Sequence, residues 1–122
     1  MKKDMKVLIV DDEPLLREII AFNIADEGYK VLQASGGFEA LELIEKETIH
    51  LVITDMRMPS GTGEDLLRAL LVKDSKPKVI LMSGACELTK ENAIELGALD
   101  FLFKPFDIKD INKHAQTIYD SL

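Results

Sequence analysis

Short apolar runs of strand length alternate along this chain with longer segments of helical periodicity. The apolar runs cover residues 5–10, 30–34, 50–54, 78–82 and 100–103. The first, third and fourth runs are almost wholly apolar, which is typical of strands buried on both faces of a sheet. The pattern therefore predicts a parallel sheet with helices on both faces, joined by right-handed crossovers.

The segments between and after these runs have apolar residues at helical spacing. They cover residues 14–28, 37–46, 62–73, 88–97 and 107–120. Residues typical of helix ends stand at their borders, namely Pro14, Gly28, Thr62 with Asp65, and Gly97. In the second segment Phe38, Leu41 and Ile44 fall on one stripe, which predicts that this stripe faces the core.

Length and composition fit one globular domain, so we expect a single domain over residues 1–122 with no effector domain in this chain. The net charge of −7 disfavours direct binding to nucleic acid or to anionic membranes. No apolar run approaches the roughly 20 residues that a membrane-spanning helix needs, and the first residues do not continue into a secretory signal. Cys86 is the single cysteine, which excludes an internal disulfide. These features lead us to expect a cytoplasmic protein.

Charged and hydroxyl side chains follow four of the five predicted strands. They are Asp11, Asp12 and Glu13 after the first run, Asp55 after the third, Ser83 after the fourth and Lys104 after the fifth. Ligands of open α/β sheets bind outside the carboxyl ends of the strands, so we expect these side chains to meet there. Taken alone, Asp11, Asp12, Ser83 and Lys104 are each more typical of a loop, a helix cap or the solvated surface than of a site. Asp55 alone is equally typical of a turn.

Together, these groups have the chemistry of a phosphoryl site. Neighbouring carboxylates repel one another unless a cation lies among them, and oxygen ligands suit a hard ion such as Mg²⁺. A lysine favours ionised carboxylates and can contact phosphate oxygens. The residues therefore predict a pocket for a phosphoryl group beside a divalent metal, with an aspartate available as nucleophile.

Four motifs give the chain a resemblance to a known family. "VDDE", "ITDMRMP", "LMSGA" and "GALDFLFKPF" occur in family order and at near-family spacing. The chain resembles the CheY-like receiver domain of two-component response regulators over nearly its whole length. The resemblance implies a doubly wound (βα)5 three-layer sandwich, with a five-stranded parallel sheet in flavodoxin-like strand order 2-1-3-4-5.

The resemblance also assigns roles to single residues. Asp55 matches the phosphoacceptor, which takes a phosphoryl group from a sensor histidine kinase or a histidine phosphotransfer protein. Lys104 and Ser83 match the groups that contact the phosphoryl oxygens. The Mg²⁺ (or Mn²⁺) ligands would be Asp11, Asp12, Asp55 and the backbone carbonyl of Arg57. Glu13 is either an outer-shell acid or a neighbour of the helix cap.

Phosphorylation is expected to change the surface of the fourth helix, fifth strand and fifth helix. In the receiver scheme Ser83 moves to bond the phosphoryl group and Phe101 turns inward to fill the vacated space. Pro105 matches a proline whose preceding peptide bond is usually cis. We expect a downstream protein or a missing effector domain to recognise the changed surface, and the chain to be a monomer or a weak phosphorylation-dependent dimer.

Three other classes of protein are less consistent with the sequence. Aspartyl phosphatases of the haloacid-dehalogenase type need a second aspartate two residues after the nucleophile, where this chain has Arg57. Flavodoxins need a phosphate-binding loop after the first strand, where this chain has acids. A receiver-like interaction module without phosphorylation would not need the full set of site residues. We therefore expect no enzyme activity beyond self-directed phosphotransfer and autodephosphorylation, and no metal or catalytic role for His50 or His114.

Overall fold

Five parallel strands form one sheet in the order β2-β1-β3-β4-β5. The structure is a computed structural model, and it describes residues 4–58, 62–72, 77–84 and 89–122. The strands are β1 (Lys6–Val10), β2 (Lys30–Ala34), β3 (Leu51–Asp55), β4 (Lys78–Ser83) and β5 (Asp100–Phe103). The sequence prediction of a doubly wound parallel sheet in this order is therefore confirmed.

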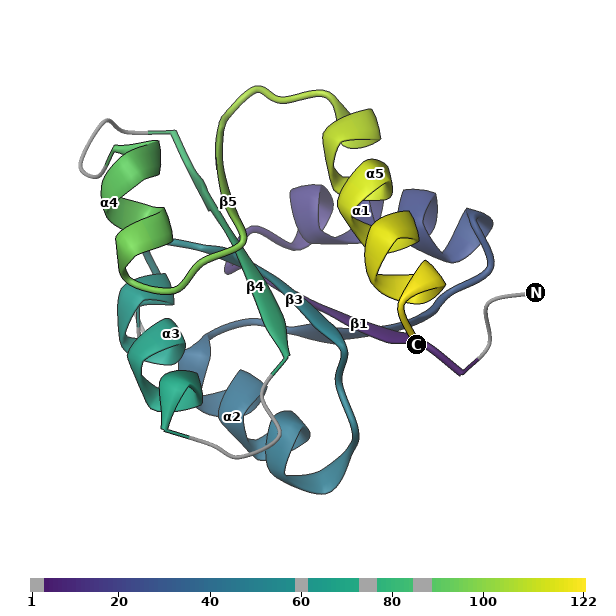
Figure 1. Cartoon of the computed structure of the whole chain (residues 1–122), viewed down its shortest axis with the longest axis horizontal. Helices are drawn as coiled ribbons and strands as arrows, with labels where there is room; N and C mark the ends of the chain where they lie inside the picture. The colour runs from purple at the N-terminus through teal and green to yellow at the C-terminus, as the bar shows by residue number, and fades with distance from the viewer. Residues whose placement is uncertain (1–3, 59–61, 73–76, 85–88) are drawn as a thin grey trace.

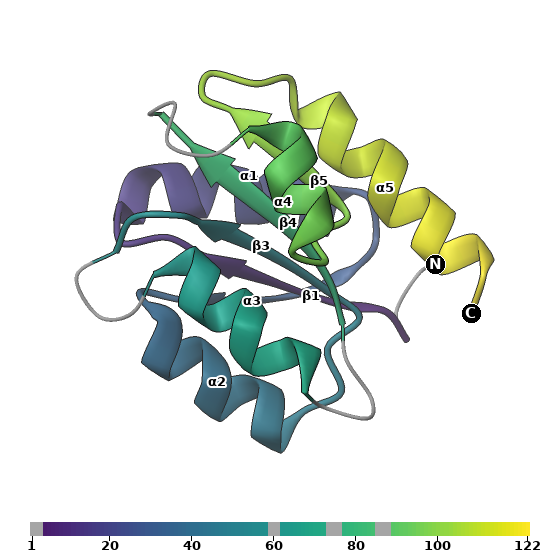
Figure 2. The same ribbon diagram turned by 60° about the vertical axis from the view of Figure 1, so that its left-hand side comes forward.

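Helices cover both faces of the sheet, as the nearly continuous apolar runs predict. They are α1 (Pro14–Asp26), α2 (Gly37–Lys46), α3 (Gly63–Leu71), α4 (Lys90–Glu95) and α5 (Ile108–Asp120). Figures 1 and 2 show α1 and α5 on one face and α2, α3 and α4 on the other. Among the described residues, no helix is both long and apolar enough to cross a membrane.

Each face of the sheet has its own apolar core. On the α1 and α5 side, alternate strand residues such as Ile9 and Ile53 pack with Ile24 and Ile111. On the other side, residues such as Leu8, Val52 and Leu81 pack with leucines of α3. All five residues of β3 are buried, whereas in β2 at the sheet edge only Ala34 is buried. The central strands are thereby held on both faces, which makes their carboxyl ends a rigid platform.

Four strand boundaries and one side chain differ from the sequence prediction. β1 and β3 each begin one residue later than predicted, while β3 extends to Asp55 and β4 to Ser83. Both site residues therefore belong to strands and not to the loops that follow. Phe38 is 67% exposed, so the predicted stripe is wrong at this position. Ala40 faces the core in its place, because a small residue allows α2 to lie close to the sheet.

Two predicted helix-end residues, Thr62 and Gly28, lie at helix ends in the structure, and their local geometry explains why. Thr62 caps α3 by accepting a hydrogen bond from the Asp65 backbone N–H through its hydroxyl at 3.0 Å. Gly28 ends α1 with φ of 101°, a conformation that favours glycine. Cys86, whose thiol we expect to be free, lies outside the described residues.

Candidate phosphoryl and metal site

Three aspartates meet at the carboxyl ends of β1 and β3. Asp11 and Asp12 directly follow β1, and Asp55 is the last residue of β3. One carboxylate oxygen from each lies within 4.8 Å of the others. Asp11 is fully buried and Asp55 is 7% exposed, whereas Asp12 is exposed to solvent. The neighbouring strands β1 and β3 are paired in parallel register, which brings their ends to the same edge of the sheet.

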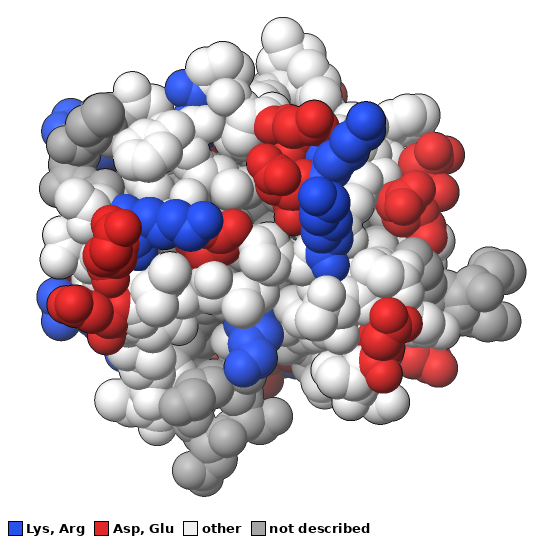
Figure 3. All heavy atoms as spheres, turned by 45° about the horizontal axis from the view of Figure 1, so that its top comes forward, with Lys and Arg blue, Asp and Glu red and all other residues white. Residues whose placement is uncertain are grey.

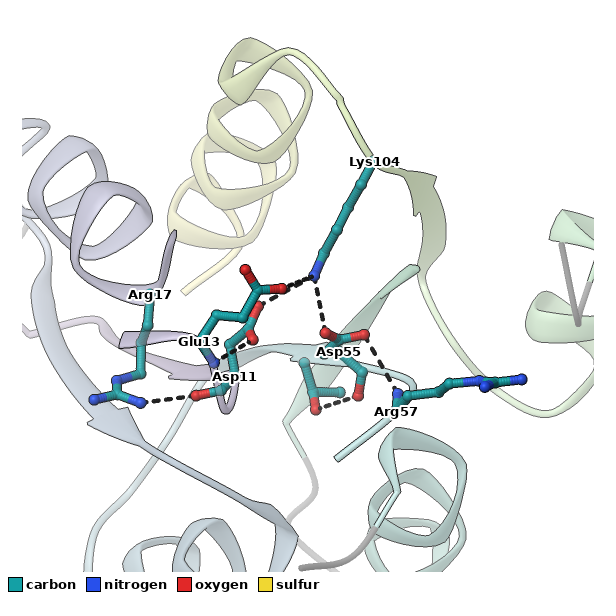
Figure 4. Close-up of polar contacts among 7 residues, drawn as sticks. Asp11, Glu13, Arg17, Asp55, Arg57 and Lys104 are labelled. Carbon is teal, nitrogen blue, oxygen red and sulfur yellow. Dashed lines mark hydrogen bonds and ion pairs between the residues drawn. The ribbon is translucent and has the colours of Figure 1, made fainter. Parts of the chain in front are cut away.

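Lys104 is the cation nearest to these acids among the described ion pairs. Its Nζ lies 2.8 Å from Asp55 Oδ2, 3.3 Å from Asp11 Oδ2 and 3.9 Å from Glu13 Oε1. Figure 4 shows its side chain reaching from the end of β5 down to the carboxylates. The Lys104–Pro105 peptide bond is cis, the geometry expected from the resemblance. The structure thus joins the ends of β1, β3 and β5 in one ionic cluster.

The charges in this cluster do not balance. Burial raises the pKa of Asp11, and the nearby Asp55 charge adds to this, although the Glu13 backbone N–H and Lys104 oppose it. Burial lowers the pKa of Lys104, but its hydrogen bond to Asp55 and the charges of Asp11 and Asp55 outweigh burial and raise it. Both pKa values are raised, as expected where one ammonium serves two buried acids. The site is therefore short of positive charge.

The backbone around Asp55 directs its carboxylate into the open edge of the sheet. Its Oδ1 accepts a hydrogen bond from the Arg57 backbone N–H at 3.3 Å, while Oδ2 accepts one from Lys104. Thr54 donates from its hydroxyl to the Asp55 carbonyl at 3.0 Å. The Arg57 side chain points away from Asp55 in Figure 4. The backbone of Arg57 and not its guanidinium therefore faces the site.

An open cleft of about 360 Å³ lies above the acids. Its lining residues are Asp12, Glu13, Asp55, Arg57, Ser83, Gly84 and Lys104. All but Asp11 of the charged or hydroxyl residues that the sequence predicted for the site therefore line it. Glu13 is the N-cap residue of α1 but makes no side-chain cap bond, so its carboxylate is left at the rim. On the face shown in Figure 3, the described acidic and basic side chains are interspersed, without one extended basic patch.

Ser83 and Phe101 lie on the neighbouring strands β4 and β5. Ser83 is 2% exposed, and its carbonyl accepts a hydrogen bond from the Lys104 backbone N–H at 2.8 Å. Phe101 is buried and packs edge-on against Phe103, with ring centroids 4.9 Å apart. In this structure the Phe101 ring therefore already lies inward, in the position that the resemblance expects after phosphorylation.

A third buried acid, Asp100, lies at the opposite end of β5 from the site and links β5 to α4 and α5. Its carboxylate lies 2.7 Å from His114 Nε2 on α5 and 3.1 Å from Lys90 Nζ on α4, and it accepts the Phe101 backbone N–H at 2.8 Å. Burial raises the pKa of Asp100, but these hydrogen bonds and the Lys90 charge outweigh it and hold the pKa below its ordinary value of 3.8. Sequence spacing gave no sign of this contact for His114.

We expect this cluster to make the domain sensitive to acid. Because the pKa of Asp100 is lowered by folding, the unfolded chain binds the proton first, and stability falls as the pH drops below 3.8 towards the folded pKa. Asp100→Asn should be less stable at neutral pH and should lose stability less steeply in acid. Urea unfolding over a pH series measures both effects, with exposed Asp110→Asn on α5 as the matched control. Parallel acid profiles for Asp100→Asn and wild type would contradict this role.

The fold and site define this chain as a receiver domain. It belongs to the response regulator receiver domain family, whose model matches residues 7–116. It is 39% identical to sporulation initiation phosphotransferase F of Bacillus subtilis (strain 168), over 87% of this chain and 86% of that protein. It is 36% identical to response regulator RR06 of Streptococcus pneumoniae serotype 2, over 93% of this chain but only 52% of that longer protein.

Solved receiver structures have the same architecture. The receiver domain of Francisella response regulator 1452 has a TM-score of 0.88 at 29% identity, covering 96% of this chain and 98% of that one. Response regulator TrrA of Thermotoga maritima, solved in complex with Mg²⁺ and BeF, has a TM-score of 0.82 at 26% identity, covering 93% and 98%. The sequence prediction overlooked two residues beside this site, Arg17, which bonds the Asp11 carbonyl, and Gly63, which lies against the Asp55 backbone.

Proposed function

We propose that Asp55 is the phosphoacceptor of this receiver domain and that its donor is a phosphohistidine. The observation that carries the proposal is the meeting of Asp55, two further aspartates and Lys104 at one edge of the sheet, beside an open cleft. An Asp55 carboxylate oxygen would attack phosphorus, forming an O–P bond while the P–N bond to the histidine breaks. The electron pair of that bond leaves with the imidazole. Self-directed hydrolysis of the acyl phosphate would later restore the carboxylate.

The residues of the cleft fit a divalent ion such as Mg²⁺ or Mn²⁺. Asp11, Asp12 and Asp55 supply carboxylate oxygens, the ligand type that hard cations prefer, and the backbone carbonyl of Arg57 would complete the protein ligands. Burial, together with the nearby Asp55 charge, raises the pKa of Asp11. A bound ion would neutralise these acids and part of the charge of the phosphoryl group. Glu13 at the rim would belong to the outer shell.

Lys104 and Ser83 are proposed to contact the transferred phosphoryl oxygens. Lys104 already bonds Asp55, and Ser83 lines the same cleft. Ser83 and Phe101 would form the switch that alters the surface of α4, β5 and α5 for a downstream protein or an attached effector domain. The packing around them would exist in two conformations, and phosphorylation would shift the population from one to the other. The chain spans about half of the pneumococcal regulator. What an attached effector domain would do is therefore only proposed.

The phosphodonor is proposed to be a histidine kinase or a histidine phosphotransfer protein in the cytoplasm. α1 begins beside the site and carries an exposed apolar stripe, with Leu15 72%, Ile19 50% and Phe22 73% exposed. Such a stripe beside a reacting group is typical of a surface that contacts another protein. It supports a donor that docks along α1 while its histidine reaches Asp55.

The test is phosphorylation by acetyl phosphate with Mg²⁺, followed by the intact mass of the protein. We expect a gain of one phosphoryl group, dependent on Mg²⁺, and a change in the NMR spectrum around Ser83 and Phe101 with BeF₃⁻. A chain that binds Mg²⁺ but gains no mass and does not respond to BeF₃⁻ would instead be an interaction module that works without phosphorylation.

Lys104 is expected to compete with the metal for the carboxylates. Lys104→Met should bind Mg²⁺ about tenfold more tightly, because even one charge pair at this spacing is worth about 1 kcal/mol in water and the ion carries two charges. The same variant should be phosphorylated more slowly, since no ammonium would contact the phosphoryl oxygens. Calorimetric Mg²⁺ titration and the phosphorylation rate measure both effects, with exposed Lys109→Met as the control. Weaker Mg²⁺ binding by Lys104→Met would contradict the competition.

A further inference from the structure

Arg17 makes two hydrogen bonds behind the acidic cluster. This partly buried residue of α1 donates from one terminal guanidinium nitrogen to the backbone carbonyl of Asp11 at 2.8 Å. It also donates from Nε to the Gln33 side-chain oxygen on β2 at 3.1 Å. Figure 4 shows Arg17 on one side of Asp11 and Asp55 on the other. The guanidinium therefore links the β1–α1 loop to the edge strand without touching the reacting carboxylate.

The carbonyl that Arg17 binds belongs to the peptide unit between Asp11 and Asp12. That unit is planar, so holding its oxygen also fixes the plane from which the Asp12 side chain departs. The other groups of Asp11 are held as well, since its N–H donates to the Ala34 carbonyl at 3.1 Å and its Oδ1 accepts the Glu13 N–H at 2.9 Å. Arg17 is the side chain that completes this anchoring.

We infer that Arg17 is a positioning residue that orients Asp11 and Asp12 for divalent-cation binding, an inference that rests on the proposed function. Its bond to the carbonyl acts one step behind the ligand atoms, in the way that outer hydrogen bonds orient metal ligands. The fork of the guanidinium suits this task, because it can bond the Asp11 carbonyl and Gln33 in fixed relative directions. A lysine at this position could hold only one of them at a time.

A purely electrostatic role and a positioning role of Arg17 predict opposite changes in Mg²⁺ affinity when its side chain is removed. The guanidinium is a cation near the acids, so its charge alone opposes the binding of another cation. If charge were its only influence, Arg17→Met would bind Mg²⁺ more tightly than the wild type. If Arg17 positions the acids, the same substitution would weaken binding, because the peptide unit between them would be free to rotate.

The experiment compares Mg²⁺ affinities of wild type, Arg17→Met, Arg17→Lys and Gln33→Ala by calorimetric titration of the full chain. We expect Arg17→Met to bind about tenfold more weakly, the lower end of what outer hydrogen bonds to metal ligands contribute. Arg17→Lys, which keeps the charge, and Gln33→Ala, which removes one anchor of the guanidinium, should each show a smaller loss. Arg68→Met is the matched control, since Arg68 is exposed on α3 and pairs only with Glu64 among the described ion pairs.

Phosphorylation gives a second readout. At saturating Mg²⁺ the acetyl phosphate rate of Arg17→Met should recover towards that of the wild type, because the variant keeps Asp55 and Lys104. Unchanged or tighter Mg²⁺ binding by Arg17→Met, or by Arg17→Lys and Gln33→Ala if Arg17→Met does not fold, would overturn the role of Arg17 alone. A wild-type chain that binds no Mg²⁺ would overturn the proposed function and this role together.

Discussion

Asp55→Asn is expected to abolish phosphorylation by acetyl phosphate. The amide that replaces the carboxylate carries no charge and is a poor nucleophile, so no acyl phosphate can form at this position. The substitution is nearly isosteric and also removes one acidic charge from the cluster of three aspartates, so the fold should persist. Intact mass after incubation with Mg²⁺ and acetyl phosphate measures the result directly.

Two further variants locate the acceptor. Asp65→Asn, an exposed acid at the start of α3, should be phosphorylated like the wild type. Asp12→Asn should still be phosphorylated, but more slowly, because it loses a proposed metal ligand and keeps the nucleophile. A full gain of one phosphoryl group by Asp55→Asn would show that another residue is the acceptor.

Gly63→Ala adds a single methyl group near the site. Of all such additions there, we expect this one to cause the largest loss of stability. A Cβ at this position would collide with the Asp55 carbonyl oxygen, and would lie 3.0 Å from the Asp55 carbonyl carbon and 3.1 Å from Met56 Cα. These are backbone atoms of a buried strand, so they cannot rotate away. We expect a loss of about 3 kcal/mol in the free energy of unfolding, the upper part of the range for overpacked sites.

The same collision should also reduce phosphorylation, because it moves the strand end that carries Asp55. Gly84→Ala is the matched control for stability, since a Cβ there would have nothing within 4 Å. Urea unfolding gives the stability change and the acetyl phosphate rate gives the effect on the site. An unfolding free energy for Gly63→Ala equal to that of Gly84→Ala would show that α3 can shift away without loss.

The sequence predicted the sheet well because its signal is local. Runs of apolar residues identify strands buried on both faces, and each predicted strand lies within one residue of the observed one at either end. Phe38 was misplaced for a related reason. Helical periodicity identifies a stripe but does not show which edge of that stripe lies against the sheet, and Ala40 is small enough to take that place.

The acids, Ser83 and Lys104 could be predicted because each ends or follows a strand, and the topology of a parallel sheet brings strand ends together. Arg17 and Gly63 could not be predicted from the same signal. Arg17 acts through a backbone carbonyl and a residue of the edge strand, and Gly63 through the distance between α3 and β3. The pairing of Asp100 with His114 likewise depends on how α5 lies across β5, which no spacing along the chain reveals.

The amide of Lys104, which donates to the Ser83 carbonyl at 2.8 Å, gives the domain a built-in spectroscopic marker. A hydrogen bond that lengthens or shortens changes the chemical shift of its proton. One cross-peak of ¹⁵N-enriched protein therefore senses any separation between the end of β4 and the loop after β5, without a dye that could disturb the cleft. That resonance would allow the domain's state to be followed in solution, even when its partner proteins are unknown.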